Sequence, residues 1–591
     1  RQMECACVRT NFSISTYPKD KIDELFFGPK SKSMTCNSSD TMESQNAHTT
    51  LGEYLINQLY SLNVHHIFGI PGDYVLGFYD QLTKSKIKII NTCDEQSAGF
   101  AADAYARVRG LGAVCVTYCV GGLKIVNSTA EAYAEKSPVV VISGAPGLPE
   151  KKKTPLLHHR VRDFNTQRDI FSNVTIASTI LDNPEDAPAE IERVLSAAIR
   201  HKMPVYIELP RDNVYKTISN PRICSVPEFN SDAAVIREAL QEAVSMINSA
   251  QMPVVVAGVE VQRFGLQELL LKFLQKTNIP VVSTPLSKSV INELHPSYLG
   301  VYEGAMGYPD VRNYVESSDC VLLIGTFMTD IDFGNSPTPV EQGKTINITS
   351  SKLSIKHHNY ENVEMRDFLE KLNNADLRKR NIDTSLKREG ILPLQQRPSN
   401  RDKITVDGLF GKLNEFLTAD YMVIADVGDA LFGGLDLVIH KGTEFLSPAY
   451  YLSMGFAIPA SIGAQLANPT IRPIVLVGDG AFQMTGTELS TIAREKLNPI
   501  IILLNNDGYR TERTILDGPF NDLYSWDYSK IIELLKVGVS FDVHSNREFE
   551  SALEKAKENG REFVLINVHL DRFDASAALK RLTESLSKKV R

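Results

Sequence analysis

The sequence predicts an α/β protein with three successive doubly wound parallel-sheet domains. Three observations favour this class. Short apolar runs recur along the chain, they alternate with longer segments of helical periodicity, and the alternation restarts after polar, proline-containing stretches. Strands that are apolar throughout are typical of parallel sheets with helices on both faces. The 591 residues also exceed what one hydrophobic core usually holds.

The bulk composition restricts the classes of partner. The chain has a formal net charge of −8, with 43% hydrophobic and 23% charged residues, as is usual for a soluble globular protein. This mildly acidic balance disfavours nucleic acid as a partner, because phosphate binding usually requires a basic surface. No uncharged apolar run reaches the ~18 residues of a membrane span. We therefore expect neither a nucleic-acid-binding nor a membrane protein.

The cysteine pattern indicates the redox environment. The eight cysteines show neither the spacing of a CxxC metal site nor that of a disulfide framework. Three of them lie in or beside apolar runs. Buried, reduced thiols are typical of a reducing compartment, and we predict a cytoplasmic location.

Polar, proline-containing stretches divide the chain. Segments 220–232 and 387–402 have this character and are predicted to separate domains. Residues 1–41 are excluded from the fold as a disordered or non-native leader: a tail, a targeting segment or translated upstream sequence. Acidic residues in KDKIDELFF disfavour a transit peptide. The predicted domains are 42–225, 226–402 and 403–591.

The first domain is predicted to begin with a helix after Thr50, in which Leu51, Leu55, Leu59 and Leu62 share one face. Another helix, over 95–110, is rich in small residues and therefore able to pack closely against a neighbour. Apolar runs predict strands within 66–70, 86–90, 112–118, 138–145 and 201–213.

The other two domains repeat this alternation. Apolar runs in the middle domain predict strands within 252–261, 279–285, 320–326 and 344–349. Those in the last domain predict strands within 421–428, 473–480 and 499–507.

A glycine-flanked aspartate follows one of the last domain's strands. Asp479 lies between Gly478 and Gly480, which by itself fits a solvated turn equally well. The next strand ends in NNDGY, residues 505–509, after the 24 intervening positions 481–504. Ligands of open parallel sheets bind at the carboxyl ends of strands. A carboxylate and an amide oxygen there suit Mg²⁺, and glycines beside a helix start suit a phosphate.

This pair of motifs resembles the signature of thiamine-diphosphate enzymes. The resemblance implies that the last domain binds the diphosphate and that the first domain binds the pyrimidine ring. It implies metal ligation by Asp479, Asn506 and the backbone carbonyl of Gly508. The cofactor-binding residues that it implies are Glu95, Gly428, Asp429, Leu452, Ser453, Met454, Asp479, Gly480, Ala481, Asn506, Gly508 and Tyr509.

Glu95 opens the small-residue helix of the first domain. Taken locally, it is an acid in a first turn, stabilised by the helix dipole. In thiamine-diphosphate enzymes an acid just before such a helix hydrogen-bonds the aminopyrimidine ring, and the resemblance assigns that role to Glu95. The neighbouring Asp94 is the alternative and is expected to be the solvated acid.

Four further residues resemble a narrower group, the pyruvate, indolepyruvate and phenylpyruvate decarboxylases. Asp73 lies in FGIPGDYV, His158 and His159 in LLHHRV, and Glu512 in NNDGYRTER. The resemblance covers residues 50 to 580. It implies non-oxidative decarboxylation of a 2-oxo acid to an aldehyde and CO2, with Glu512 near the substrate carboxylate. It assigns proton transfer to Asp73 and the two histidines, since a histidine titrates near neutral pH.

The resemblance also implies a homodimer or homotetramer with active sites between subunits. Met454 matches the apolar residue that supports the cofactor's bent shape. Thr511 and Leu431 are smaller than the residues of pyruvate-specific relatives, which suggests a larger substrate pocket, whereas Arg510 is expected to narrow its entrance or to contact the substrate carboxylate. A second histidine pair, His65 and His66, is interpreted as packed at the start of a strand.

Two other functions remain as alternatives. A carboligase of the acetolactate-synthase type shares the fold and the cofactor, but it lacks the histidine loop with the paired acids. A catalytically silent thiamine-diphosphate sensor is expected to lack Glu95 or another active-site acid. A dinucleotide-dependent dehydrogenase is disfavoured, because no GxGxxG follows the first strand of any domain.

Overall fold

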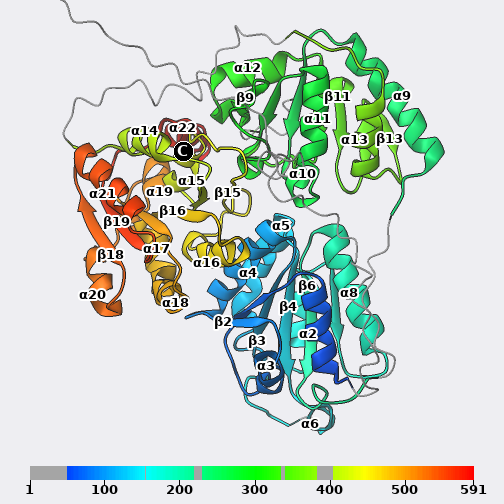
Figure 1. Ribbon diagram of the computed structural model, residues 1–591, viewed down its shortest axis with the longest axis vertical. Coiled ribbons are helices and arrows are strands. Elements are labelled where there is room, and N and C mark those ends of the chain that lie inside the picture. The colour runs from blue at the N-terminus through cyan, green and yellow to red at the C-terminus, as the bar shows by residue number, and fades with distance from the viewer. Residues whose placement is uncertain (1–48, 154, 219–228, 334–339, 382–402, 591) are drawn as a thin grey trace, which may run out of the picture. The chain divides into compact units, whose positions relative to one another are not determined.

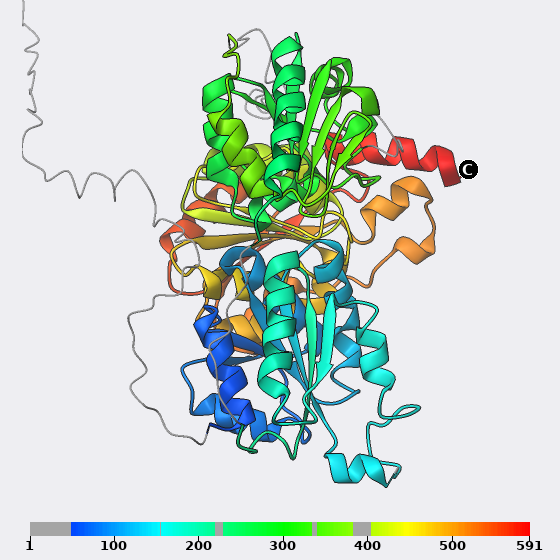
Figure 2. The ribbon, with the colours of Figure 1, turned by 90° about the vertical axis from the view of Figure 1, so that its right-hand side faces the viewer.

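The structure is a computed structural model and contains three sheets, one in each predicted third of the chain (Figures 1 and 2). They confirm the predicted class of three mostly parallel α/β domains, while the domain boundaries stay predictions. The leader 1–41, the segment 387–402 and most of segment 220–232 lie outside the described residues. The structure describes residues 49–153, 155–218, 229–333, 340–381 and 403–590, with side chains through residue 583.

The first sheet has the order β2-β1-β3-β4-β6-β5, and all neighbouring strands are parallel. The predicted first helix, α2, begins with a capping box in which Thr50 and Glu53 each accept the other's backbone N–H. Its strands are β1 His66–Gly69, β2 Lys88–Asn91, β3 Gly112–Val116, β4 Val139–Ala145, β5 Ala177–Ile180 and β6 Val205–Pro210. Its helices are α2 Leu51–Ser61, α3 Leu76–Thr83, α4 Glu95–Arg109, η1 Leu123–Ile125, α5 Val126–Ala134, α6 Leu148–Lys152, α7 Thr166–Phe171 and α8 Ala187–His201.

The middle sheet has the order β13-β12-β11-β10-β7-β8-β9. Five strands are parallel, and an antiparallel hairpin, β12 and β13, extends one edge. Its strands are β7 Pro253–Ala257, β8 Val281–Ser283, β9 Tyr298–Val301, β10 Cys320–Ile324, β11 Thr345–Ile348, β12 Leu353–Ile355 and β13 His358–Tyr360. Its helices are α9 Ala233–Ser249, α10 Val259–Arg263, α11 Gln267–Thr277, η2 Pro285–Ser287, η3 Gly304–Met306, α12 Pro309–Ser317, η4 Gln342–Lys344 and α13 Met365–Asn374.

The last sheet is fully parallel, in the order β15-β14-β16-β17-β19-β18. The chain leaves β14 toward one edge and later continues from β16 toward the other. A crevice between such strands is where open parallel sheets bind ligands. The strands are β14 Tyr421–Ala425, β15 Phe445–Leu446, β16 Arg472–Gly478, β17 Ile500–Asn505, β18 Val539–Val543 and β19 Val564–His569. The helices are α14 Val406–Phe416, α15 Asp429–Gly434, α16 Ala457–Ala467, α17 Asp479–Thr485, η6 Gly486–Glu488, α18 Leu489–Arg494, α19 Arg510–Ile515, η7 Pro519–Asn521, η8 Tyr528–Lys530, α20 Ile531–Leu535, α21 Asn546–Glu558 and α22 Ala577–Val590.

Helices α4 and α16 join the first and last domains. Both are rich in alanine and glycine, and a Cβ at Gly463 would lie 1.9 Å from the carbonyl oxygen of Ala101. Beside this contact the buried Arg107 pairs with Asp103 and Glu135 and donates to the carbonyl of Ser447. The close packing predicted for the small-residue helix is therefore observed. Within the described residues, no helix combines the length and apolar character that crossing a lipid bilayer demands.

Glu303 is a buried acid just before η3 in the middle domain. Burial raises its pKa from 4.5 to about 8, and the positive charges of Arg581 and Lys288 offset only part of this effect. At neutral pH the folded protein therefore holds this carboxyl group in its neutral form.

The free energy of unfolding should consequently fall as pH rises from about 4.5 to about 8, since the unfolded chain releases the Glu303 proton throughout this window while the folded chain retains it. Glu303→Gln removes this contribution, so the variant should gain stability relative to the wild type as pH rises. Calorimetric unfolding at several pH values measures the difference. Glu316→Gln, at the surface of the same domain, is the control, and parallel curves for Glu303→Gln and the wild type would contradict the expectation.

Candidate active site

A cleft opens at the carboxyl ends of β14, β16 and β17. It encloses about 590 Å³, its open side included, and three loops form it. They contribute residues 427–430, 478–481, 506 and 508–512, together with Leu504 and Met454. Both motifs singled out in the sequence, GDG and NNDGY, therefore face the same space.

Asp479 is fixed at the base of this cleft by backbone groups. Its Oδ2 accepts the N–H groups of Asn506 and Gly508, both at 3.1 Å, and its Oδ1 accepts that of Gly480 at 2.8 Å. The residue is only 2% exposed, and burial raises its pKa to about 6, against the lowering by these hydrogen bonds. Among the described residues, no lysine or arginine forms an ion pair with Asp479.

Asn506 and Gly508 carry the other two predicted metal ligands. The Oδ1 atom of Asn506 is buried and has no hydrogen-bond partner among the described residues. Gly508 has φ +146°, and a Cβ there would lie 2.1 Å from the carbonyl oxygen of Asn521, so only glycine fits. A buried carboxylate without a cation and a buried amide oxygen without a donor fit a hard cation such as Mg²⁺.

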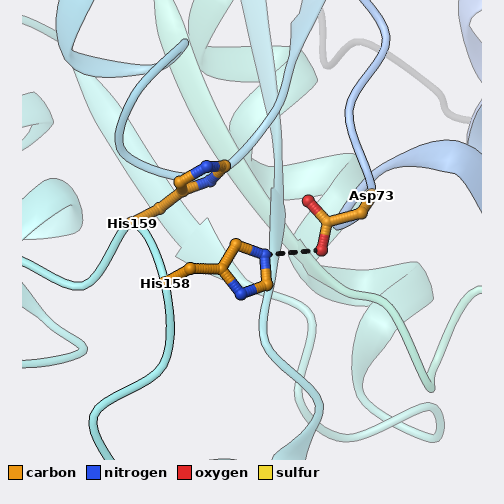
Figure 3. Close-up of side chains that lie close together, drawn as sticks. All are labelled: Asp73, His158 and His159. Carbon is orange, nitrogen blue, oxygen red and sulfur yellow. Dashed lines mark hydrogen bonds and ion pairs between the residues drawn. The ribbon is translucent and has the colours of Figure 1, made fainter.

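The first domain brings Asp73, His158 and His159 together (Figure 3). His158 Nε2 lies 2.9 Å from Asp73 Oδ2, and the two histidine rings meet edge to face with centroids 4.7 Å apart. His159 has φ +68°, which is uncommon for a residue other than glycine, and its buried Nδ1 has no hydrogen-bond partner among the described residues. Arg211 adds a positive charge 3.8 Å from Asp73. Asp73 and His158 can share a proton, and one ring nitrogen of His159 lies within 4.8 Å of a ring nitrogen of His158 and a carboxylate oxygen of Asp73.

Glu95 is the first residue of α4, and Asp94 is its N-cap. Asp94 Oδ1 accepts the N–H of Gln96, as a capping acid does. The Glu95 side chain is 14% exposed, whereas that of Asp94 is 35% exposed. The more solvated acid is thus Asp94, as predicted.

The first-domain candidates do not line the cleft. The described residues around it all belong to the last domain, and Glu95, Asp73, His158 and His159 are not among them. One chain therefore holds two separate groups of candidate residues.

Comparison with known proteins shows that the domains carrying the two groups of candidate residues occur together in one enzyme family. Family models of thiamine pyrophosphate enzymes match the chain in sequence order: the N-terminal TPP binding domain at residues 49–167, the central domain at 240–372 and the C-terminal TPP binding domain at 426–568. An indole-3-pyruvate decarboxylase of Azospirillum brasilense is 34% identical over 90% of this chain and 98% of its own length.

The chain belongs to the thiamine-pyrophosphate-dependent 2-oxo acid decarboxylase family. Two further relatives agree. A probable pyruvate decarboxylase of Schizosaccharomyces pombe is 30% identical over 90% of this chain and 95% of its own. An alpha-keto-acid decarboxylase of Mycobacterium avium is 31% identical over 91% and 97%. The family and the class of enzyme, a carboxy-lyase, are those predicted from the sequence.

The decarboxylase cleft contains most of the last-domain residues that the sequence assigned to the cofactor. Gly428, Asp429, Met454, Ala481 and Tyr509 line it, in addition to the metal-ligand candidates and Gly480. Leu452 and Ser453 do not line it but directly precede Met454. Leu452 has φ +59°, and Ser453 Oγ accepts a hydrogen bond from Asn127 of the first domain.

Arg510 donates hydrogen bonds to the C-terminal segment of the decarboxylase. This contact was not predicted from the sequence. Its Nε and Nη2 donate to the backbone carbonyls of Asp574 and Phe573 at 3.0 and 2.6 Å, and its Nη1 bonds Thr514. Arg510 also lines the cleft, and the expectation that it narrows the entrance or contacts the substrate carboxylate stays a prediction. Asp429 binds the same segment, because it accepts the N–H of Ser576.

Of the two residues that were expected to enlarge the substrate pocket, Thr511 lines the cleft and Leu431 does not. Thr511 and Glu512 lie on α19 and line the cleft. Leu431 is buried in the hydrophobic core and is not among the residues that line the cleft, and the larger substrate pocket stays a prediction.

The second histidine pair is packed, as interpreted. His65 stacks on Tyr60 and contacts Arg109, and His66 meets the edge of Tyr105. Burial lowers the pKa of His66 to about 4, so this ring stays neutral at neutral pH.

Proposed function

We propose that this enzyme decarboxylates a 2-oxo acid without oxidation, releasing CO2 and an aldehyde, and that its substrate is pyruvate or a larger branched or aromatic 2-oxo acid. The observation that carries the proposal is the Asp73–His158–His159 cluster, in the same chain as the Asp479 cleft and Glu512. A carboligase of the acetolactate-synthase type is not expected to carry this cluster. The names of the relatives, which include pyruvate and indole-3-pyruvate decarboxylases, support the proposal.

Asp479, Asn506 and the carbonyl of Gly508 would hold Mg²⁺, which in turn would hold the diphosphate of thiamine diphosphate. When bound, thiamine diphosphate supplies the electron sink for the departure of CO2. Met454 would support the cofactor from the cleft wall, and Glu512 would lie beside the substrate carboxylate.

The first-domain residues would act from a second copy of the chain. Glu95 would hydrogen-bond the aminopyrimidine ring, and Asp73 with His158 and His159 would supply and remove protons at the substrate. Two observations support this assembly, a homodimer or homotetramer. The cleft of one chain is lined by the last domain alone. Beside it, Gln483 donates to the carbonyl of Tyr524, and this places two strongly exposed apolar side chains, Met484 and Tyr524, on neighbouring segments that a second copy could cover.

The composition and the cysteines support a cytoplasmic location. Cys93, Cys115, Cys119 and Cys320 are free thiols, and three of them are buried. Such thiols persist in a reducing compartment.

Product analysis tests the proposed reaction. Purified enzyme with Mg²⁺ and thiamine diphosphate is incubated with pyruvate, 2-oxoisocaproate, phenylpyruvate or indolepyruvate. We expect equal amounts of CO2 and aldehyde from at least one of them, and His159→Ala should lower aldehyde formation about 100-fold because the proton relay is interrupted. Affinity for the cofactor should be unchanged.

The control is His65→Ala, which alters the packed histidine pair of the same domain. Acetolactate in place of aldehyde would indicate the carboligase, and no product from any acid would indicate a cofactor sensor. Equal losses of cofactor binding and of aldehyde formation in His159→Ala would contradict the relay.

A further inference from the structure

Lys124 contacts the acid that the proposed function assigns to the cofactor. It lies in η1, and its Nζ is 3.3 Å from Glu95 Oε2. The same ammonium group forms an ion pair with Asp94 Oδ2. The Lys124 side chain is half exposed.

We infer that Lys124 is a positioning residue for Glu95. Its ammonium group holds Oε2 and fixes the plane of the carboxylate, which leaves Oε1 to meet the aminopyrimidine ring of the cofactor. The inference rests on the proposed function and goes beyond it, because it assigns separate tasks to the two carboxylate oxygens.

The ammonium group is itself held in place. Asp94 contacts Lys124 through Oδ2, while its Oδ1 accepts the N–H of Gln96 and caps α4. The backbone before the helix is fixed as well, since Glu488 Oε1 of the last domain accepts the N–H groups of Cys93 and Asp94. A reactive group held by such a supporting shell keeps a narrow range of orientations.

The charges around the pair favour this arrangement. Hydrogen bonding to Asp94, more than the contact with Glu95, raises the pKa of Lys124 against the effect of burial, so the ammonium form persists at neutral pH. An ion pair with a half-exposed lysine adds little to stability, so substitution of Lys124 should leave the fold intact. Once a second copy covers the site, the same contact lies in a less polar medium and orients Glu95 more strongly.

Deuterium exchange at C2 of the bound thiamine ring tests the inference, because that exchange depends on Glu95 and precedes any reaction with substrate. We expect Lys124→Met to slow the exchange about tenfold, as the misplacement of a catalytic group does. In the Glu95→Gln background the same substitution should cause no further loss, since Lys124 acts through Glu95. Lys124→Arg should restore part of the rate.

Two further measurements exclude a merely structural effect. Calorimetric affinity for Mg²⁺ and thiamine diphosphate should stay within about twofold in Lys124→Met, because the last domain provides that binding. In the cofactor-free protein, acetylation of Lys124 followed by mass spectrometry should be faster in Glu95→Gln than in the wild type. Lys84→Met is the control, because Lys84 pairs with Asp80 at 2.7 Å on the same domain, in an exposed position.

The C2 exchange rates distinguish a failure of the proposed function from a failure of the positioning role of Lys124. If the wild type does not accelerate C2 exchange, the proposed function fails. If it does, and Lys124→Met exchanges as fast as the wild type, only the positioning role is overturned. A large additional loss in the double variant would also overturn it, because Lys124 would then act independently of Glu95.

Discussion

Glu95→Gln should lower turnover by about 10²–10⁴-fold, the usual range for loss of a general acid or base, while the enzyme still binds Mg²⁺ and thiamine diphosphate. Glutamine matches glutamate in size but neither gives up nor takes up a proton at neutral pH. The proposed diphosphate site is the cleft of the last domain, and Glu95 is not among the residues that line it. Steady-state rates together with calorimetry of cofactor binding measure both parts of the expectation.

Glu190→Gln is the matched control for this variant. Glu190 lies on α8 of the same domain, partly exposed, where its side chain pairs with Arg193 and accepts a hydrogen bond from Thr179. Near-normal turnover in Glu95→Gln would remove the assignment of Glu95, and a loss of turnover in Glu190→Gln as well would point to a general effect on the domain.

Asp479→Asn should weaken the binding of thiamine diphosphate with Mg²⁺ by about 100-fold or more, at the upper end of the effects known for groups that support a metal site. The substitution removes the negative charge that would face the proposed cation. It also replaces one acceptor oxygen by an NH2 group, which opposes the N–H donors of Gly480, Asn506 and Gly508. Titration calorimetry with the cofactor at fixed Mg²⁺ gives the affinity.

Asp507→Asn provides a close comparison. Asp507 is exposed in the same loop, between two metal-ligand candidates, and its φ of +59° suits asparagine as well as aspartate. The Asp507→Asn variant should bind thiamine diphosphate with the same affinity as the wild type. Equal affinities in the two variants would show that the charge at position 479 is not needed, and a wild type that releases no heat with cofactor and Mg²⁺ would contradict the whole interpretation.

Site residues could be predicted best from the sequence where a candidate ligand residue directly follows an apolar strand. Asp479 and Asn506 could be placed together because each ends a run that only a buried parallel strand explains, and such strands present their carboxyl ends on one edge of a sheet. Strands β5, β9, β12, β13, β15, β18 and β19 were not predicted from the sequence. Strands β9, β12, β13 and β15 have four residues or fewer, and β5 and β18 are partly exposed, so they lack the continuous buried run that marks the central strands. Strand β19 is apolar and almost wholly buried, and it was missed although it has such a run.

Local sequence patterns also did not predict contacts between segments that are distant along the chain. The sequence did not indicate that Arg510 donates to the backbone carbonyls of Phe573 and Asp574. No pattern of side chains predicts a carbonyl as a partner. Lys124 gave no signal either, since its link to Glu95 exists only once η1 and the start of α4 come together in space.

The contact between α4 and α16 also limits what can be separated by protein engineering. One continuous hydrophobic cluster contains Phe100 and Tyr105 of the first domain together with Ile424 and Phe456 of the last. A gene fragment encoding either domain alone would leave half of this cluster facing water, and such a fragment is a poor candidate for a portable module. The middle domain has a cluster of its own, but Val259, Leu286 and Met306 also pack into the cluster of the last domain, so an exchange between homologues there has to keep these three side chains.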